Sequence, residues 1–405
     1  ARLLALENHS SETVVLTGML VGGAVLDPAG REGLASLTAA VAQRGTVSRS
    51  YDQIYDQLDS LGASLSMGAG DYVVSFHAKC LGRHWPAVAE LVADLLRRPS
   101  FPPEELQRAR GEILTRLREF DQSTRMVAAR ELAHLVYPEG HPLRHPAHGY
   151  RATVEAMTRE DLAACHRLLF RPDALIVSLV GDLEASAALD RVSEMLGDWS
   201  APGEPLPTPG LAAHHPPEAQ RAVFALADKS QADIALGFKG IPRRHPDFYA
   251  LDQATEIVGG LGLMGRLGDN VRDRQGLAYY AFARMAEGLG EDLWSVSAGV
   301  NPANVERAVT SILDEIRRLQ DEPVAEEELA DCQNYLVGVL PLHLETNDGL
   351  ASTLNDVELF GLGEDYIERY PNLVRAVTRE AVQRAAQAHL TAERYSLAIA
   401  GPPGP

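Results

Sequence analysis

The stretch Val154-Glu155-Ala156-Met157-Thr158-Arg159-Glu160 returns later in the chain as Val374-Arg375-Ala376-Val377-Thr378-Arg379-Glu380, at an offset of 220 residues. Further matches occur at the same offset, in segments that independently show the same pattern of apolar residues. Repeated chance matches at one fixed offset are improbable, so we interpret the chain as a tandem duplication of one unit. The further matches pair Asp94, Arg97 and Arg98 with Asp314, Arg317 and Arg318, Ser75 and Ala78 with Ser295 and Ala298, and Leu179-Val180-Gly181 with Ile399-Ala400-Gly401.

Within one unit, the predicted strands and helices occur in separate runs. Alternating apolar and β-branched residues predict strands, and apolar residues at helical spacing predict helices. Separate runs favour an α+β fold, in which an antiparallel-rich sheet carries helices on one face, over a doubly wound parallel sheet. In the first unit we expect strands over residues 2–6, 12–25, 63–67, 72–80 and 174–180, and helices over 34–41, 51–61 and 85–96, from 103, from 158 and over 183–196.

The composition changes between Trp199 and Glu218, where six prolines occur in a weakly apolar segment. Proline fixes φ and removes a backbone donor, so this segment is expected to be a stiff, extended connector. We therefore predict two domains, residues 1–198 and 219–405, joined by a linker over residues 199–218. This division agrees with a length of 405 residues, which exceeds a single typical core.

Composition and charge exclude several classes of protein. A net charge of −19 argues against binding to nucleic acid, which requires clustered Lys and Arg. The three cysteines, Cys80, Cys165 and Cys332, are far apart and contain no C-x-x-C pair, which favours reduced thiols and a cytoplasmic location. The longest apolar stretch, residues 14–26, is interrupted by Thr and Gly and is too short to span a membrane, and no targeting segment is expected within the chain.

One predicted helix has the spacing of a metal motif but not its chemistry. Leu34, Leu37 and Val41 recur at helical spacing and predict one buried face, which leaves Ser36, Ala39 and Ala40 on the other face. In an H-x-x-E-H motif, the two His one turn apart would hold zinc and the Glu would act as general base. Here these positions hold Ser, Ala and Ala, and alanine can neither bind a metal nor move a proton.

The frame of this helix resembles that of the pitrilysin/insulinase family of zinc metallopeptidases, which includes the mitochondrial processing peptidase subunits. The family pattern is G-L-A-H-x-x-E-H, of which the chain keeps Gly33-Leu34-Ala35. The resemblance places Ser36 and Ala40 at the zinc ligands and Ala39 at the general base. It also implies two similar α/β-sandwich domains that together form half of a clamshell.

The resemblance extends to a later helix, which in the family supplies the third zinc ligand at the end of a pattern like E-R-x-x-I-L-x-E. The stretch from Arg110 to Arg116 fits this frame, which puts Arg116 at the ligand and Ala109 at a supporting carboxylate. A guanidinium has no lone pair to offer zinc. We therefore expect no metal and no catalytic residue in this chain alone. The nearby Glu112 and Glu119 are interpreted as surface carboxylates of a helix.

Two groups of histidines are candidate metal sites. His141, His145 and His148 lie in a loop with two prolines, and the resemblance explains a His-Pro pair in this loop by packing. His214 and His215 lie in the predicted linker. Neither group has the regular spacing of ligands on one helical face, so packing or solvation is the preferred interpretation.

Residues 260–265 formally satisfy the dinucleotide pattern G-x-G-x-x-G, which requires a strand before it and a helix after it. The preceding residues 248–258 have helical spacing instead, so a nucleotide site is not expected. The stretch instead resembles the family's G-G-x-x-S-R-L-x-x-x-V-R-E-x-x-G-L-A-Y segment, whose glycines allow close backbone approach. The matching residues are Gly259, Gly260, Gly265-Arg266-Leu267, Val271-Arg272-Asp273 and Gly276-Leu277-Ala278-Tyr279.

In the family, the residues matching Arg272 and Tyr279 reach the substrate beside the zinc, and Gly259 and Gly260 lie near the same wall. An Arg can hold a peptide carbonyl or carboxylate, and a Tyr hydroxyl can donate to the oxygen that gains charge during hydrolysis. The competing interpretation is a surface Arg and a Tyr packed in the core.

These observations support two hypotheses. The first is a non-catalytic, substrate-binding subunit of a heterodimeric peptidase, in which a zinc-bearing homologous partner supplies the metal and the general base for a peptide substrate. The second is a structural or peptide-holding protein, comparable to the core subunits of respiratory complexes that resemble this family. The sequence shows no group of residues that would support nucleophilic catalysis, so independent catalysis by another mechanism is not expected.

Overall fold

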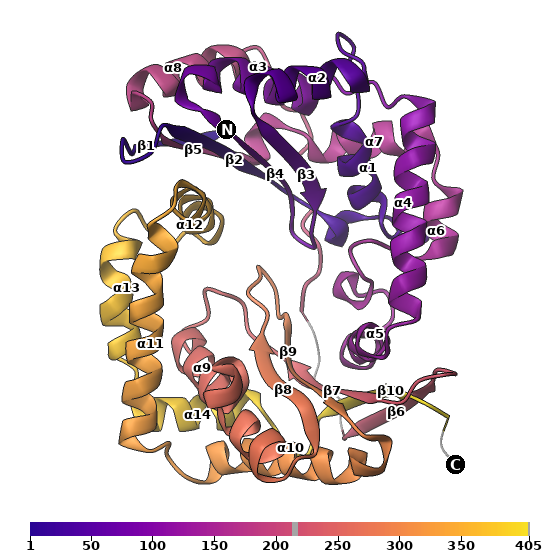
Figure 1. Cartoon of the computed structure of the whole chain (residues 1–405), viewed down its shortest axis with the longest axis vertical. Coiled ribbons are helices and arrows are strands. Elements are labelled where there is room, and N and C mark those ends of the chain that lie inside the picture. The colour runs from indigo at the N-terminus through magenta and orange to yellow at the C-terminus, as the bar shows by residue number, and fades with distance from the viewer. Residues whose placement is uncertain (213–217, 404–405) are drawn as a thin grey trace. The chain divides into compact units, whose positions relative to one another are not determined.

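A computed structural model of the chain describes residues 1–212 and 218–403 (Figure 1). Within these residues, the strands form two five-stranded sheets with the orders β1-β5-β2-β4-β3 and β6-β10-β7-β9-β8. In each sheet only the first pair is parallel, β1 with β5 and β6 with β10, and the other pairs are antiparallel. The α+β class and the duplication are confirmed. The strands are β1 (Arg2–Glu7), β2 (Thr13–Val21), β3 (Ser64–Ala69), β4 (Val73–Leu81), β5 (Leu175–Gly181), β6 (Gln220–Ala225), β7 (Ala232–Lys239), β8 (Ala278–Met285), β9 (Leu293–Val300) and β10 (Ser396–Gly401).

Equivalent elements of the two halves begin at the offset found in the sequence. The strands β4 and β9 begin at Val73 and Leu293, which are 220 residues apart. The helices that follow them, α3 (Trp85–Arg97) and α10 (Val305–Asp321), also begin 220 residues apart. The duplication is therefore present in the structure with the same register as in the sequence.

The repeated sequence stretch starts a helix in each half. The helices α7 (Arg159–Leu169) and α14 (Arg379–His389) follow Thr158 and Thr378, whose hydroxyls each accept a backbone N–H bond of 3.2 Å. The repeat therefore contains a repeated N-cap, which fixes where each helix starts.

The chain divides into two compact units that are not continuous in sequence. Unit 1 comprises residues 1–117, 146–209 and 340–364, and unit 2 comprises residues 118–145, 210–339 and 365–405. One helix of each half is thereby exchanged: α5 (Thr124–Val136) packs on β7 and β10, and α12 (Asn347–Phe360) packs on β2 and β5. The domains predicted from the linker, residues 1–198 and 219–405, do not include this exchange.

The exchanged helix α12 accounts for the burial pattern of the first sheet. In Figure 1, α3 and α8 (Ala185–Leu196) lie on one face of this sheet and α12 lies on the other. All seven residues of β5 are buried, as expected for a strand covered on both faces. The remaining helices of unit 1 are α1 (Leu34–Ala42), α2 (Tyr51–Leu61), α4 (Pro103–Asp121) and α6 (Arg151–Ala156).

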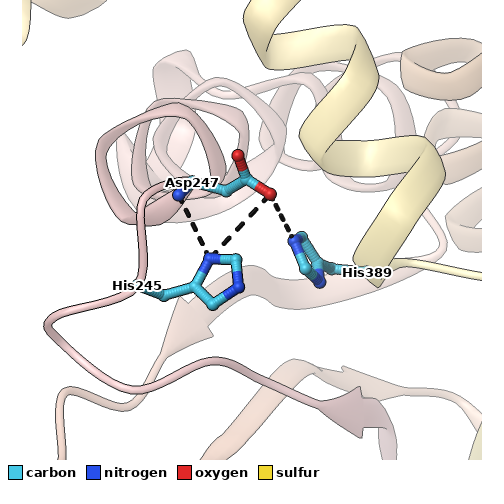
Figure 2. A group of neighbouring side chains, drawn as sticks. All are labelled: His245, Asp247 and His389. Carbon is cyan, nitrogen blue, oxygen red and sulfur yellow. Dashed lines mark hydrogen bonds and ion pairs between the residues drawn. The ribbon is translucent and has the colours of Figure 1, made fainter.

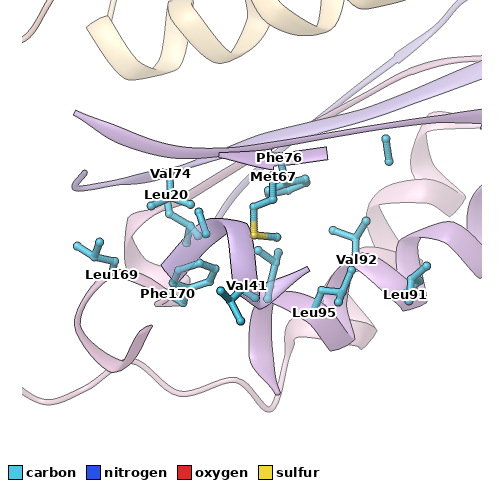
Figure 3. Close-up of a cluster of buried hydrophobic side chains, with 14 of the residues drawn as sticks. Leu20, Val41, Met67, Val74, Phe76, Leu91, Val92, Leu95, Leu169 and Phe170 are labelled. Atoms are coloured by element: carbon cyan, nitrogen blue, oxygen red, sulfur yellow. The ribbon is translucent and has the colours of Figure 1, made fainter. Parts of the chain in front are cut away.

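The core of unit 1 lies between the sheet and the helices of its own half. Figure 3 shows Leu20, Val74 and Phe76 of the sheet together with Val41 of α1 and Leu95 of α3, and all of these are buried. Burial of each such side chain contributes about 1.5–3 kcal/mol. This core fixes α1 against the sheet.

The core of unit 2 is built in the same way around Trp294 and Phe238, whose rings lie 5.6 Å apart. The indole Nε1 of Trp294 donates to Thr255 Oγ1 at 2.7 Å, which ties β9 to the end of α9 (Phe248–Thr255). The other helices are α11 (Glu326–Leu344), which continues into residues of unit 1, and α13 (Tyr366–Arg375). Two short π-helical segments, η5 (Glu256–Gly260) and η7 (Gly268–Arg274), follow α9.

Most expected elements are present, with two differences. The strand expected to extend to residue 25 ends at Val21 and is followed by a short 3-10 helix over Ala24–Leu26. The helix expected from residue 103 is present as α4, but the helices α5 and α6 that follow it were not expected. The hydroxyl of Ser123, just before α5, accepts the N–H of Met126. Among the described residues, no helix is both long enough and apolar enough to cross a bilayer.

Candidate functional site

The start of α1 is held by a network of backbone contacts. One carboxylate, that of Asp27, accepts the N–H groups of Gly33, Leu34 and Ala35 at 2.8–3.0 Å. Gly33 has φ 95°, and a Cβ there would lie 2.7 Å from the carbonyl oxygen of His148. Glycine is therefore required at this position, because the loop containing His148 packs directly on the first turn of the helix.

The structure corrects the predicted arrangement of α1. The sequence pattern places Ala39 on the outer face with Ser36 and Ala40, but Ala39 is fully buried in the core. The physical reason is that α1 packs on both β3 and α7, so nearly the whole helix is enclosed. Ser36 and Ala40 remain half-buried and line a pocket.

This pocket, of about 340 Å³, lies entirely within unit 1. It brings together Ser36 and Ala40 of α1 with Arg116 of α4. By the family resemblance, these three residues occupy the positions of the zinc ligands. Ala109, the position of the supporting carboxylate, also lines it. The remaining lining residues are Gln43, Arg44, Met67, Gly68, Ala69, Glu112, Ile113, Leu117, Ala147 and His148.

Polar side chains in and beside α1 join the helix to its surroundings. Gln43, just after the helix, donates from Nε2 to the carbonyl of Met67 at 3.1 Å and accepts the N–H of Met67 at 3.2 Å. The Ser36 hydroxyl donates to the carbonyl of Ala147 at 2.7 Å. These bonds use the polar groups of Ser36 and Gln43 to connect the helix with the edge strand β3 and with the loop before α6.

The charged residues of the pocket are arranged as a pair and a single cation. Arg44 binds both carboxylate oxygens of Glu112, at 3.1 and 2.6 Å, and this guanidinium holds the pKa of Glu112 below its usual range. Glu112 is therefore an ionised partner of Arg44. Arg116 is exposed, and within the part of the chain that the structure describes no acidic side chain forms a salt bridge with it. Glu119 is exposed on the same helix and does not line the pocket.

The histidines of the loop over residues 137–150 do not form a ligand group. His141 is buried, its ring stacks on Tyr137 at 4.6 Å, and its Nδ1 accepts the N–H of Leu143 at 3.2 Å. Neither His141, His145 nor His148 belongs to a cluster of three potential ligands among the described residues. The expected packing role of His141 agrees with these contacts. His214 and His215 lie outside the described residues.

One cluster of metal-ligating side chains does occur in unit 2, formed by His245, Asp247 and His389 (Figure 2). The Nε2 of His389 lies 2.9 Å from Asp247 Oδ2, and the Nδ1 of His245 accepts the backbone N–H of Asp247 at 3.1 Å. Asp247 is the N-cap residue of α9, and His389 ends α14. Because these groups bond to one another, we interpret the cluster as a link between two helices.

Two of the glycines in residues 259–265, Gly259 and Gly265, are explained by backbone packing. A Cβ at Gly259 would lie 2.5 Å from the backbone nitrogen of Ala283, and one at Gly265 would lie 3.0 Å from the Cα of Gly259. At Gly260, a Cβ would meet the carboxylate of Glu256. The segment follows α9 rather than a strand, so the context of a dinucleotide fingerprint is missing, as expected.

Arg272 and Tyr279 lie in the two elements that follow these glycines, η7 and β8. Arg272 is half-buried in η7, a π-helical segment of the kind often found at functional sites. Tyr279 is 80% exposed, at a β-bulge between Ala278 and Tyr280 at the start of β8. Its ring is thus not packed in the core, contrary to the competing interpretation.

Tyr280, the residue after Tyr279, shows how the bulge changes the direction of the side chains. The hydroxyl of Tyr280 donates to Asp233, and the guanidinium of Arg125 lies 5.1 Å from its ring. One extra residue in a strand redirects a side chain, and bulges often occur beside active sites for this reason. The sequence did not predict the bulge, because Ala-Tyr-Tyr-Ala fits a regular strand equally well.

Comparisons with known proteins agree with the fold and with the family resemblance. Residues 3–146 match the family model "Insulinase (Peptidase family M16)", and residues 156–336 match "Peptidase M16 inactive domain". An uncharacterized zinc protease of Bacillus subtilis is 22% identical over 99% of this chain and 96% of its own length. A probable mitochondrial-processing peptidase subunit beta of Schizosaccharomyces pombe is 25% identical over 63% of this chain and 56% of its own length.

Solved structures share the fold across the whole chain. A peptidase M16 inactive domain from Pseudomonas fluorescens superposes with a TM-score of 0.91 at 22% identity, and the match covers 99% of this chain and 95% of that one. A chain of complex III2 from Candida albicans superposes with a TM-score of 0.81 at 12% identity, over 98% of this chain and 93% of that one. At these identities the likeness describes the fold alone.

Proposed function

Because this chain belongs to the insulinase family of M16 peptidases, we propose that it is a non-catalytic, substrate-binding subunit of a two-chain zinc peptidase. In this proposal, a zinc-bearing homologue supplies the metal and the general base. This chain supplies part of the wall that holds the peptide, together with Arg272 and Tyr279.

The observation that carries the proposal is the contrast between two sites. At the pocket of α1 and α4, the carboxylate that lines it, Glu112, is bound by Arg44, and Arg116 adds a second positive charge. A divalent cation would find no free ligand among these charged groups and would be repelled. In unit 2, by contrast, the hydroxyl-bearing ring of Tyr279 is presented to solvent.

The proposed chemistry of Arg272 and Tyr279 follows from their donor groups. A peptide bond attacked by zinc-bound water develops negative charge on its carbonyl oxygen, and a positioned hydroxyl stabilises that charge. The Tyr279 hydroxyl would donate to this oxygen. The Arg272 guanidinium would hold a neighbouring carbonyl or carboxylate of the peptide, so that the bond to be cleaved lies at the partner's zinc.

The partner and the location are part of the same proposal. In the family that the chain resembles, each chain supplies half of a chamber, so we propose a homologous second chain as the partner that completes it. A cytoplasmic location is supported by Cys80, Cys165 and Cys332, which are all free and buried. With its net charge of −19, the chain is not proposed to bind nucleic acid.

Reconstitution tests this function. The full chain would be mixed with a homologue from the same genome that carries an intact H-x-x-E-H motif, and cleavage of a quenched fluorescent peptide library would be measured. We expect a stable complex that cleaves peptides, and no cleavage by this chain alone. The matched control replaces the partner's motif Glu by Gln, which should abolish the activity of the complex. Cleavage by the isolated chain, or full activity of the partner alone, would contradict the proposal.

The alternative is a structural or peptide-holding role without any part in cleavage. The fold shared with a chain of a respiratory complex is compatible with this alternative. It predicts that the chain joins an assembly whose peptidase activity does not change when Arg272 or Tyr279 is replaced.

A further inference from the structure

The pocket between α1 and α4 has one unbalanced positive charge. Its charged lining residues are Arg44, Glu112 and Arg116. Arg44 and Glu112 neutralise each other through a two-point ion pair, which leaves the guanidinium of Arg116. The chain as a whole has a net charge of −19, so this local excess is not a general property of the surface.

The space around Arg116 results from small side chains. Ala40 and Ala109 line the pocket at positions where longer residues would fill it. Its volume of about 340 Å³ lies at the lower end of the range of ligand pockets, which begins at about 300 Å³. Met67, Ile113 and Leu117 supply apolar wall, so the pocket combines one cation with a surface suited to an aliphatic side chain.

We infer that this pocket binds a carboxylate of a peptide, with the Arg116 guanidinium as its partner. A guanidinium presents paired N–H donors whose geometry matches the two oxygens of a carboxylate. The carboxylate can belong to the C-terminus of the peptide or to an Asp or Glu side chain. This inference rests on the proposed function and names the class of substrate. The substrates would be peptides with a negatively charged group that enters the pocket of unit 1.

The guanidinium of Arg116 is available to bind a carboxylate because the other polar side chains named below are engaged elsewhere. Ser36 and Gln43, two other polar residues of the pocket, bond to backbone groups of the protein. Glu112 is occupied by Arg44, so it does not compete for Arg116 through a direct ion pair. A carboxylate that enters the pocket therefore meets a guanidinium that forms no direct salt bridge within the described residues and acts on Glu112 only as a nearby charge.

Direct binding to the isolated full chain tests this inference without the partner. Fluorescence anisotropy would compare three labelled short peptides of the same length: one with a free C-terminus and Gln inside, one amidated with Glu inside, and one amidated with Gln inside. We expect the uncharged peptide to bind least. Which of the other two binds more tightly identifies the source of the carboxylate. Equal binding of all three peptides, or no binding of any of them, would overturn the inference.

Substitutions in the pocket would show whether the difference in peptide binding arises there. Arg116→Ala should raise the Kd of the charged peptide by about 10- to 100-fold, as expected for loss of a hydrogen bond to a charged group. Ala40→Leu should weaken binding by filling the space while leaving Arg116 in place. The matched control is Arg167→Ala, which removes an exposed Arg of α7 outside the pocket and should leave the Kd unchanged. Circular dichroism would confirm that each variant is folded.

The result of this binding test can be distinguished from the result of the reconstitution test of the proposed function. If Arg116→Ala binds the charged peptide as wild type does, the pocket inference is wrong, whether or not the reconstituted complex cleaves peptides. If the complex is inactive but the pocket binds carboxylates as described, the subunit role fails and the binding site remains.

Discussion

Tyr279 and Tyr280 are neighbours in the chain but lie in opposite environments. Tyr279 is 80% exposed, whereas the ring of Tyr280 is held between Asp233 and Arg125. A hydrogen-bonded, stacked Tyr serves stability, and an exposed Tyr at a bulge is free to meet a substrate. At the residue scale, the proposed contact of Tyr279 with a substrate is argued from this exposure.

Replacing Tyr279 by Phe should lower the turnover of the reconstituted complex by roughly 10- to 1000-fold, because one donor to the charged oxygen is lost. Association of the two chains should not change, since the ring is retained. The kcat would be measured with a quenched peptide, alongside complex formation by analytical ultracentrifugation. Tyr335→Phe, at a half-exposed Tyr of α11, is the control. Unchanged kcat in the Tyr279 variant would favour the structural alternative.

Replacing Arg272 by Ala should affect substrate positioning as well as the transition state. We therefore expect a higher KM together with a lower kcat, a combination that loss of a transition-state contact alone would not give. Steady-state kinetics of the complex provide both constants. Arg274→Ala, at an exposed neighbour in η7, is the control. Wild-type values of kcat and KM for both variants would remove Arg272 from the proposed site.

Asp252 on α9 should make the stability of unit 2 depend on pH. Burial, with the nearby Glu287 and Glu256 carboxylates, raises the pKa of Asp252 to about 7. Since this folded-state pKa lies above the unfolded value of about 3.9, the contribution to stability is fully present below about pH 4 and is lost as the pH rises through about 7. Asp252→Asn should therefore be more stable than wild type at pH 8, by roughly 1–4 kcal/mol, and similar to wild type near pH 4.

Urea unfolding at about pH 4.5 and about pH 8, on either side of most of this titration, would test the difference. The matched control is Glu326→Gln, which neutralises an exposed acid of the same unit. A stabilisation that is equal at both pH values would indicate a packing effect of Asn rather than the removal of a partly buried charge.

At the scale of elements, the exchanged helix α12 is the feature with the clearest energetic consequence. Ala351 is fully buried against Val15 and Val180, and the Ser178 hydroxyl donates to Asn355 Oδ1 at 2.8 Å. The small residue allows α12 to lie close to the first sheet. The first half of the chain therefore depends on a helix from the second half.

Replacing Ala351 by Leu should destabilise unit 1 by roughly 1–3 kcal/mol, because extra methylenes must fit into a filled interface. Thermal unfolding followed by circular dichroism would measure the loss. The control is Ala187→Leu on α8, where the side chain is exposed and the same change should have little effect. Equal melting temperatures for the Ala351 variant and wild type would mean that α12 is not closely packed on β2 and β5.

At the scale of the whole molecule, the prediction is that the isolated chain binds no structural or catalytic zinc and hydrolyses no peptide. In the α1–α4 pocket, Glu112 is paired with Arg44, and the positions that the family uses for zinc hold Ser36, Ala40 and Arg116. Metal analysis of protein dialysed against a weak chelator should give far less than one zinc per chain. His389→Ala would show whether any residual metal is held by the cluster of His245, Asp247 and His389. Stoichiometric zinc whose removal abolishes peptide cleavage would show that the motif was misaligned.

The sequence by itself determined the duplication, the class of fold and the position of many elements. Thr158 and Thr378 start equivalent helices because an N-cap is a contact between residues three apart, which a local pattern can reveal. The glycine segment was also recognised from its pattern, and the substrate-binding role assigned to Gly259 and Gly260 stays a prediction. Local hydrogen bonding and hydrophobic periodicity are encoded within a few residues, so these features can be predicted without the fold.

Only the tertiary structure decided the features that join distant residues. Arg44 and Glu112 are 68 positions apart, and their pairing, which leaves Arg116 as the single cation, depends on how α1 meets α4. The burial of Ala39 and the exchange of α5 and α12 follow from packing between elements. The exposure of Tyr279 depends on the register between β8 and β9. Each of these is set by contacts between segments far apart in the chain, and a local pattern carries no information about which distant partner a residue will meet.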